Sequence, residues 1–225
     1  MYPALVNDVK DPDQLGRVQV ELPWAPAAEV SGSTLPGVGK APPLQVWARL
    51  ACPMAGAGRG TWWIPDVGDE VLVAFEGGNP GAPYVVGALW NGQDQPPESM
   101  DGEGNNDLKT LKTRSGVRLR INDKEGQESM ELRTPAGQRI EIKDGSGGQV
   151  HIMDTNGNVI KLTSSGIEIS SSAKVKINAS TLDVSAATVK LKAALVDCDG
   201  IVKCETMQAK SVIASSYTPG AGNVW

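Results

Sequence analysis

Apolar and polar residues alternate with the two-residue period of a β-strand at many places along the chain. Val18 and Val20 alternate with polar neighbours, and further strands are predicted at 44–50, 70–75 and 84–89. Glycine- and proline-rich turns separate these strands, and 25–43 is expected to be a long loop. No segment of this half has the spacing of an amphipathic helix, so the pattern predicts a small closed β-barrel.

The second half repeats one short strand many times. After a strand at 117–121, apolar pairs or triples recur about every ten residues and later every seven or eight. Such short strands cannot bury themselves, and the small inward residues imply a narrow core. Interwound chains fit this spacing better than a single-chain solenoid, so we predict an obligate trimeric β-helix. The residues expected on the trimer axis are Ile167, Ile169, Val175, Ile177, Leu182, Val184, Val189, Leu191, Val196, Cys198, Val202 and Cys204.

Composition divides the 225-residue chain. Eight of the ten aromatic residues lie in the first 90 positions, and 91–216 contains none. The stretch 91–107 is rich in glycine, proline and acids, which is typical of a linker. The predicted all-β organisation is an OB-fold barrel at 1–95, a linker at 96–110, the trimeric β-helix at 111–214 and a distinct tail at 215–225.

Charge and residue counts exclude several function classes. The net charge is −5 and the pI about 5.0, without a Lys/Arg block that could follow nucleic-acid phosphates. No apolar run approaches the roughly 20 residues of a membrane helix, and the N-terminus lacks a signal pattern, so assembly in the cytoplasm is expected. With three cysteines and one histidine, we expect no disulfide framework and no catalytic, cofactor-binding or metal residues. The protein is therefore predicted not to be an enzyme.

A few residues invite sharper interpretations. His151 alternates with apolar neighbours and is expected on the outer surface. Cys198 and Cys204 fall on the inward register, where thiols pack as small hydrophobic groups, and their spacing is not that of a zinc site. Trp62 and Trp63 could stack on sugars or bases, but they have few basic neighbours in the sequence. We therefore expect them in the barrel core or in a contact between subunits.

Two segments in the first half of the chain resemble a known protein family. The segment 16–24 (GRVQVELPW) and the segment 46–92 resemble the barrel domain of contractile-injection spikes. That family comprises the phage baseplate spike (baseplate assembly protein V) and the VgrG protein of type VI secretion. The matching landmarks are Gly16-Arg17-Val18, Trp47, the glycine-rich turn 56–60, Trp63-Ile64-Pro65, Val67 to Val71, Pro80, Val86-Gly87 and Asn91-Gly92. The aromatic-free repeat resembles the trimeric β-helix that follows this barrel.

The resemblance implies a structural, homotrimeric central spike of a phage tail, tailocin, or extracellular or type VI-like injection system. It would link the baseplate hub to a tip protein and contact the target membrane only during puncture. VgrG has a large hub region before its barrel, whereas this sequence starts almost on the first strand of the barrel, so a separate hub protein is expected here. Cargo effectors are possible partners. A PAAR-type tip protein is expected on the tail, docked by Tyr217, Thr218, Pro219, Gly220, Asn223, Val224 and Trp225.

Two other function classes stay open. One is a trimeric saccharide-binding adhesin, in which the barrel holds a ligand above a stalk. The other is an envelope-degrading tail component, which needs a paired acid and base that no constellation in the barrel loops supplies. The mechanical spike alone explains the repeat, the linker and the tail together.

Overall fold

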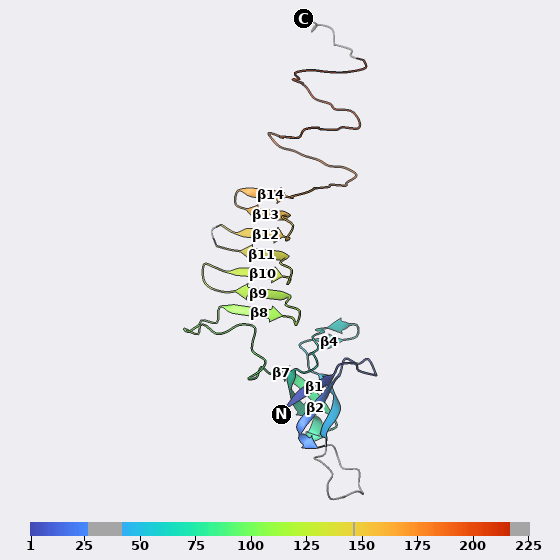
Figure 1. Ribbon diagram of the computed structural model, residues 1–225, viewed down its shortest axis with the longest axis vertical. Helices are drawn as coiled ribbons and strands as arrows, with labels where there is room; N and C mark the ends of the chain where they lie inside the picture. Colours follow the sequence, from blue (N-terminus) through green and yellow to red (C-terminus); the bar gives the residue numbers. More distant parts are fainter. Residues whose placement is uncertain (27–41, 146, 217–225) are drawn as a thin grey trace, which may run out of the picture. The chain divides into compact units, whose positions relative to one another are not determined.

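The computed structural model describes residues 1–26, 42–145 and 147–216, and the chain divides into two units, 1–174 and 175 onward. Apart from a 3-10 turn at Glu76–Gly78, all regular structure in the described residues is β-strand (Figure 1). The strands are β1 (Tyr2–Asp8), β2 (Val18–Pro26), β3 (Pro43–Leu50), β4 (Ala55–Gly56), β5 (Arg59–Gly60), β6 (Glu70–Phe75), β7 (Pro83–Ala88), β8 (Leu108–Lys112), β9 (Arg118–Asn122), β10 (Ser129–Arg133), β11 (Arg139–Lys143), β12 (Gln149–Met153), β13 (Val159–Thr163) and β14 (Gly166–Ser170).

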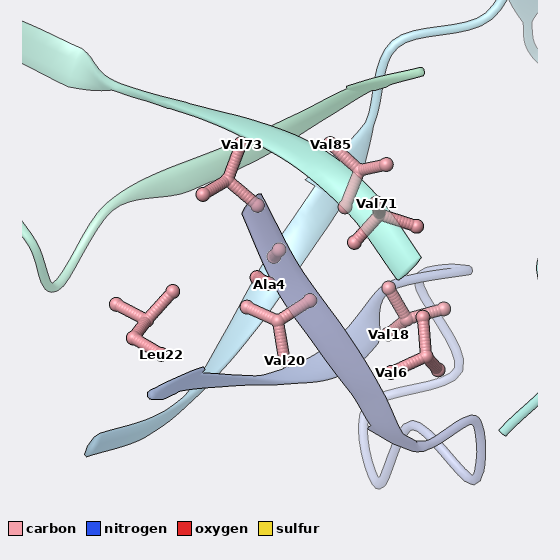
Figure 2. Close-up of a cluster of buried hydrophobic side chains, with 9 residues drawn as sticks. Ala4, Val6, Val18, Val20, Leu22, Val71, Val73 and Val85 are labelled. Carbon is pink, nitrogen blue, oxygen red and sulfur yellow. The ribbon is translucent and has the colours of Figure 1, made fainter. Parts of the chain in front are cut away.

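Five strands close into a barrel in the order β1-β2-β3-β7-β6. All neighbours are antiparallel except β3 and β7, which run parallel. Alternate residues of each strand point inward and form an aliphatic core (Figure 2). The buried residues are Ala4, Val6, Val18, Val20, Leu22, Ala48, Val71, Val73 and Val85.

The sequence prediction of a small closed barrel is confirmed, including the strands that became β2, β3, β6 and β7. It missed β1, whose alternation is hidden because Leu5 points outward while the inward Ala4 is small. A strand of this kind is assigned by its neighbours: β1 pairs with β2 on one side and β6 on the other. Without β1 the barrel could not close.

Aromatic rings extend the inward columns of the barrel at one end. Tyr2, Trp24 and Phe75 follow the core residues of β1, β2 and β6, and the Tyr2 and Trp24 ring centroids are 4.4 Å apart. The indole Nε1 of Trp24 donates a hydrogen bond to the carbonyl oxygen of Pro3 at 3.1 Å. These rings cover the end of the aliphatic core, which gives a packing reason for aromatics in this half of the chain.

The loop between β1 and β2 is organised by one carboxylate. Asp11 accepts hydrogen bonds from the backbone N–H groups of Asp13, Leu15 and Arg17, and the Arg17 guanidinium contacts it at 2.6 Å. The Arg17 guanidinium also lies over the Trp47 ring, 5.8 Å from its centroid. This explains in physical terms why an arginine stands at the entry to β2.

Replacing Asp11 by Asn is expected to make barrel stability less dependent on acid pH. The Arg17 hydrogen bond is the main reason that the pKa of Asp11 lies well below its ordinary 3.8. A carboxylate with a lowered native pKa stabilises the fold above its unfolded pKa, and this contribution disappears as pH falls toward the native value. Urea unfolding at pH 7 and at pH 3 should therefore show a smaller stability loss in the variant than in the native chain. Equal losses would contradict this role.

Gly16, which precedes Arg17, has a backbone that other residues avoid. Its φ is +73°, and a Cβ built there would lie 3.1 Å from Cζ3 of Trp62. Gly16→Ala is expected to destabilise the barrel by about 1–2 kcal/mol, because an L side chain in this region is strained. Thermal unfolding measures the loss. Gly87→Ala is the matched control, since Gly87 has no positive φ and no atom within 4 Å of its built Cβ; equal effects would refute the argument.

Strands β8 to β14 form a second, seven-stranded sheet in strict sequence order (Figure 1). Each strand has five residues and pairs antiparallel with the next through a short turn. The pattern predicted β9 and β11 to β14. It missed β8, because Lys109 interrupts the apolar alternation there. It also missed β10, although Met130 and Leu132 alternate with polar residues as Ile140 and Ile142 do in β11. β8 begins at Leu108, inside the segment predicted as a linker.

Residues 171–216 carry no strand in the structure, although the sequence pattern predicts strands there. A strand is defined by its hydrogen-bonded partner, and this segment finds none among the residues that the structure describes. The second half of the chain therefore has two parts: β8 to β14, which pair within one chain, and residues 171–216, which do not form strands in one chain.

Candidate assembly surface

The register of the β8–β14 sheet gathers its aliphatic side chains on one face. They form two columns that run across the strands, each residue directly opposite the next. One column is Leu111, Leu119, Leu132, Ile140, Ile152, Ile160 and Ile169; the other is Ile121, Met130, Ile142, Val150, Leu162 and Ile167.

This apolar face is open in the single chain. Ile142 is 42% exposed, Ile152 43% and Ile167 72%, whereas the barrel core is below 6%. Contiguous apolar surface of this extent is costly in water and marks an interaction surface. The face therefore has the composition and exposure of an interaction surface.

The residues predicted for the trimer axis divide between the two units. Ile167 and Ile169 lie on β14 and belong to the apolar face. The other ten lie from Val175 onward and are exposed in the chain, including the free thiols of Cys198 and Cys204. The single chain does not bring these ten together in a strand ladder, so their place on an axis stays a prediction.

The opposite face of the sheet carries a ladder of charges. Arg120, Glu131, Glu141, His151 and Lys161 stand directly opposite one another on consecutive strands. Glu141 is only 8% exposed, because the side chains around it lie across it. His151 lies on this face, as the alternation predicted, but its side chain is only 19% exposed and its Nδ1 is 4.0 Å from Glu141.

Ion pairs hold Glu131 of this ladder in its charged form. Burial favours the neutral form of Glu131, but the hydrogen bond from Arg118 at 2.5 Å and the charges of Arg139 and Arg133 outweigh it. The pKa of Glu131 therefore lies below its ordinary value. A face that holds its charges in this way is suited to solvent, while the aliphatic face is suited to burial.

The predicted linker is attached to the sheet. Glu98 accepts a hydrogen bond from the Thr110 hydroxyl at 2.8 Å and lies 3.4 Å from Nε of Arg120. Trp90, Met100 and Leu108 line a cavity of about 380 Å³ between this segment and β8. Composition indicated a linker but could not show this contact, because it depends on Glu98 reaching two neighbouring strands.

The turn ahead of β6 is held by a carboxylate. Asp69 accepts a hydrogen bond from the Asp66 N–H at 2.8 Å, which is a turn contact ahead of β6. Trp62 is 77% and Trp63 62% exposed, so the expectation of barrel core is wrong for both and subunit contact remains. Within the described ranges, no group of His, Cys, Asp or Glu side chains is arranged to hold a metal ion. Among the same residues there is no helix long and apolar enough to cross a membrane.

The tail predicted to receive a tip protein lies largely outside the described residues. All seven docking residues, from Tyr217 to Trp225, belong to this part.

Two protein-family models match the chain. The type VI secretion system/phage-baseplate injector OB domain covers residues 2–90. The phage baseplate V C-terminal trimerisation domain covers residues 129–200 and thus includes β10 to β14. The OB-fold assignment of the barrel is confirmed, and the apolar face falls largely within a trimerisation domain.

Curated relatives agree. The type VI secretion system spike protein VgrG1b of Pseudomonas aeruginosa is 25% identical over 59% of this chain and 17% of its own length. VgrG5 of the same organism is 33% identical over 52% of this chain and 14% of its own length. VgrG3 of Vibrio cholerae is 27% identical over 56% of this chain and 10% of its own length. The chain thus aligns with less than a fifth of these relatives, and the family is one of structural spike proteins rather than of enzymes. The chain thus combines an injector OB domain with a phage baseplate V C-terminal trimerisation domain, and it is similar to the VgrG spike proteins of type VI secretion.

Proposed function

We propose that the protein is the homotrimeric central spike of a contractile injection particle. The observation that carries the proposal is the exposed apolar face of β8–β14, which lies largely in the matched trimerisation domain. Three copies that turn these faces toward a common axis would bury both aliphatic columns and leave the charge ladders in water. Burial of this kind is worth about 25 cal/mol per Å² of apolar surface, before the entropy cost of association.

Beyond residue 174 the three chains interwind. The alternating residues from Val175 to Cys204 find no strand partner in the described part of their own chain, and a neighbouring copy supplies one. Such a fibre resists axial load, because sliding one strand breaks ladder hydrogen bonds in all three chains at once. This suits a spike that is driven forward by a contracting sheath.

The remaining parts of the proposal concern partners. A separate hub protein holds the barrel end, and a PAAR-type tip protein sits on the tail 215–225. The spike assembles in the cytoplasm, carries effector cargo where the system has one, and helps to pierce the target envelope. These assignments rest on the family and on the residues named in the tail.

Light scattering coupled to size exclusion tests the trimer. The expected mass is three times the 23.6 kDa of one chain, with a hydrodynamic radius larger than that of a compact particle of the same mass. A monomer at micromolar concentration would refute the proposal.

Deleting 215–225 is expected to leave the trimer intact and to remove the tip protein. The deleted segment lies beyond every predicted axis residue, so the fibre should assemble without it. A pull-down with the co-expressed tip protein, together with the trimer mass, measures both effects. Retention of the tip protein by the truncated spike would contradict the docking assignment.

A further inference from the structure

The two sides of the β8–β14 sheet, where its hairpin turns lie, carry opposite charge. Turns 113–117, 134–138 and 154–158 lie on one side, and the turns after Asn122, Lys143 and Thr163 lie on the other (Figure 1). The first side, the basic flank, carries Lys112, Arg114, Arg118, Arg133 and Arg139, and its three turns contribute one carboxylate, Asp154. The second side, the acidic flank, carries Asp107, Asp123, Glu125, Glu128 and Asp144, with Lys124 and Lys143.

The fold of one chain accounts for only part of the basic flank. Lys112 stands directly opposite Arg118, Arg118 opposite Arg133, and Arg133 opposite Arg139. Like charges in directly opposite positions destabilise a sheet. Arg118 and Arg139 reach Glu131, and Arg114 pairs with Asp66 at 2.7 Å. Lys112 and Arg133 form no ion pair with any residue that the structure describes.

The acidic flank is similarly unneutralised. The Asp144 N–H donates a hydrogen bond to the Glu128 carbonyl oxygen at 3.1 Å, which brings two of its turns together. Asp123 is paired with Lys109 at 2.6 Å. Glu125, Glu128 and Asp144 have no ion-pair partner among the described residues, so negative charge accumulates along this side.

Threefold symmetry determines which sides meet. When three copies stand around one axis, rotation brings one side of each sheet against the other side of the next. We propose that the basic flank of each copy docks on the acidic flank of its neighbour and closes the corners of the trimer. The inference rests on the proposed trimer and adds what sets the direction of its chains along the axis. A copy that ran in the opposite direction would place flanks of like charge together, so the flanks select three parallel chains.

Charge reversal tests the docking. One variant combines Lys112→Glu with Arg133→Glu, a second combines Glu125→Lys with Glu128→Lys, and a third carries all four changes. Lys112→Glu places an opposite charge against Arg118, and Arg133→Glu places one against Arg118 and Arg139. Because Arg133→Glu also removes a positive charge near Glu131, circular dichroism of each variant checks that the sheet of one chain stays folded. Lys10→Glu, on an exposed barrel loop, is the control for a charge change away from both flanks.

Each reversal of one flank is expected to raise the concentration at which half of the chains are trimeric by about tenfold or more, since several charge pairs become repulsive at three corners. The four-change variant should return close to the native value. The defect should shrink between about 0.01 M and about 1 M salt, where screening removes it. Dilution series by light scattering measure all of these values.

The outcomes separate the two proposals. A native trimer whose stability is unchanged in both flank variants would overturn the docking while leaving the spike assignment in place. So would a four-change variant no better than the two variants from which it is built. A native chain that never forms a trimer would instead refute the proposed function and the docking with it.

Discussion

Leu191→Asp is expected to abolish the trimer while leaving the barrel folded. Leu191 is 72% exposed in the single chain, so the change costs the isolated chain almost nothing. In the proposed fibre three carboxylates would meet on a dry axis, at an effective cost of several kcal/mol for each ion. Light scattering should show monomers, and the near-ultraviolet circular dichroism of the barrel tryptophans should match the native spectrum.

Lys190→Asp is the matched control. It introduces the same carboxylate one residue earlier, on the side that the alternation assigns to solvent. We expect it to remain trimeric. Loss of the trimer in both variants would contradict the predicted register of this segment, and its retention in both would contradict the axis.

The second large effect concerns the barrel alone. Leu22 is fully buried among the aliphatic residues of the core, and Leu22→Ala removes three carbon atoms from that core. Substitutions of this kind cost about 2–5 kcal/mol, because the transfer free energy is lost and a cavity remains. Denaturant unfolding followed by tryptophan fluorescence measures the loss, while the assembly surface on β8–β14 is untouched.

Leu15→Ala provides the comparison. Leu15 is 72% exposed, and surface changes of this type shift the free energy of unfolding by no more than about 0.5 kcal/mol. If both substitutions lowered the free energy of unfolding by the same amount, burial of Leu22 in the aliphatic core would not be what stabilises the barrel. If Leu22→Ala also dissolved the trimer, barrel and fibre would be one cooperative unit.

The two predictions act on different parts of the chain. Leu22 belongs to the unit 1–174, which contains the barrel, whereas Leu191 belongs to the unit that begins at residue 175. A spike of this design can therefore be weakened at its shaft or at its barrel independently. Together with the flank reversals, these variants distinguish apolar burial from charge as the cause of assembly.

Much of this protein was predictable from its sequence because its strands are short and alternate cleanly. Val18 and Val20, or Ile140 and Ile142, reveal a strand with one buried face without any knowledge of partners. The same alternation identified the face of His151 and the apolar residues of β14. The strong landmarks around Gly16 and Trp47 carried the family resemblance.

Three features were decided only by the tertiary structure. β1 is a strand because β2 and β6 supply its hydrogen bonds, since its own residues alternate poorly. Glu98 holds the linker because two adjacent strands present Thr110 and Arg120 to it. The basic flank contains no run of basic residues in the sequence; it exists because antiparallel register brings Lys112, Arg118, Arg133 and Arg139 into one column. Sequence determines what each strand exposes, whereas register determines which of these groups meet.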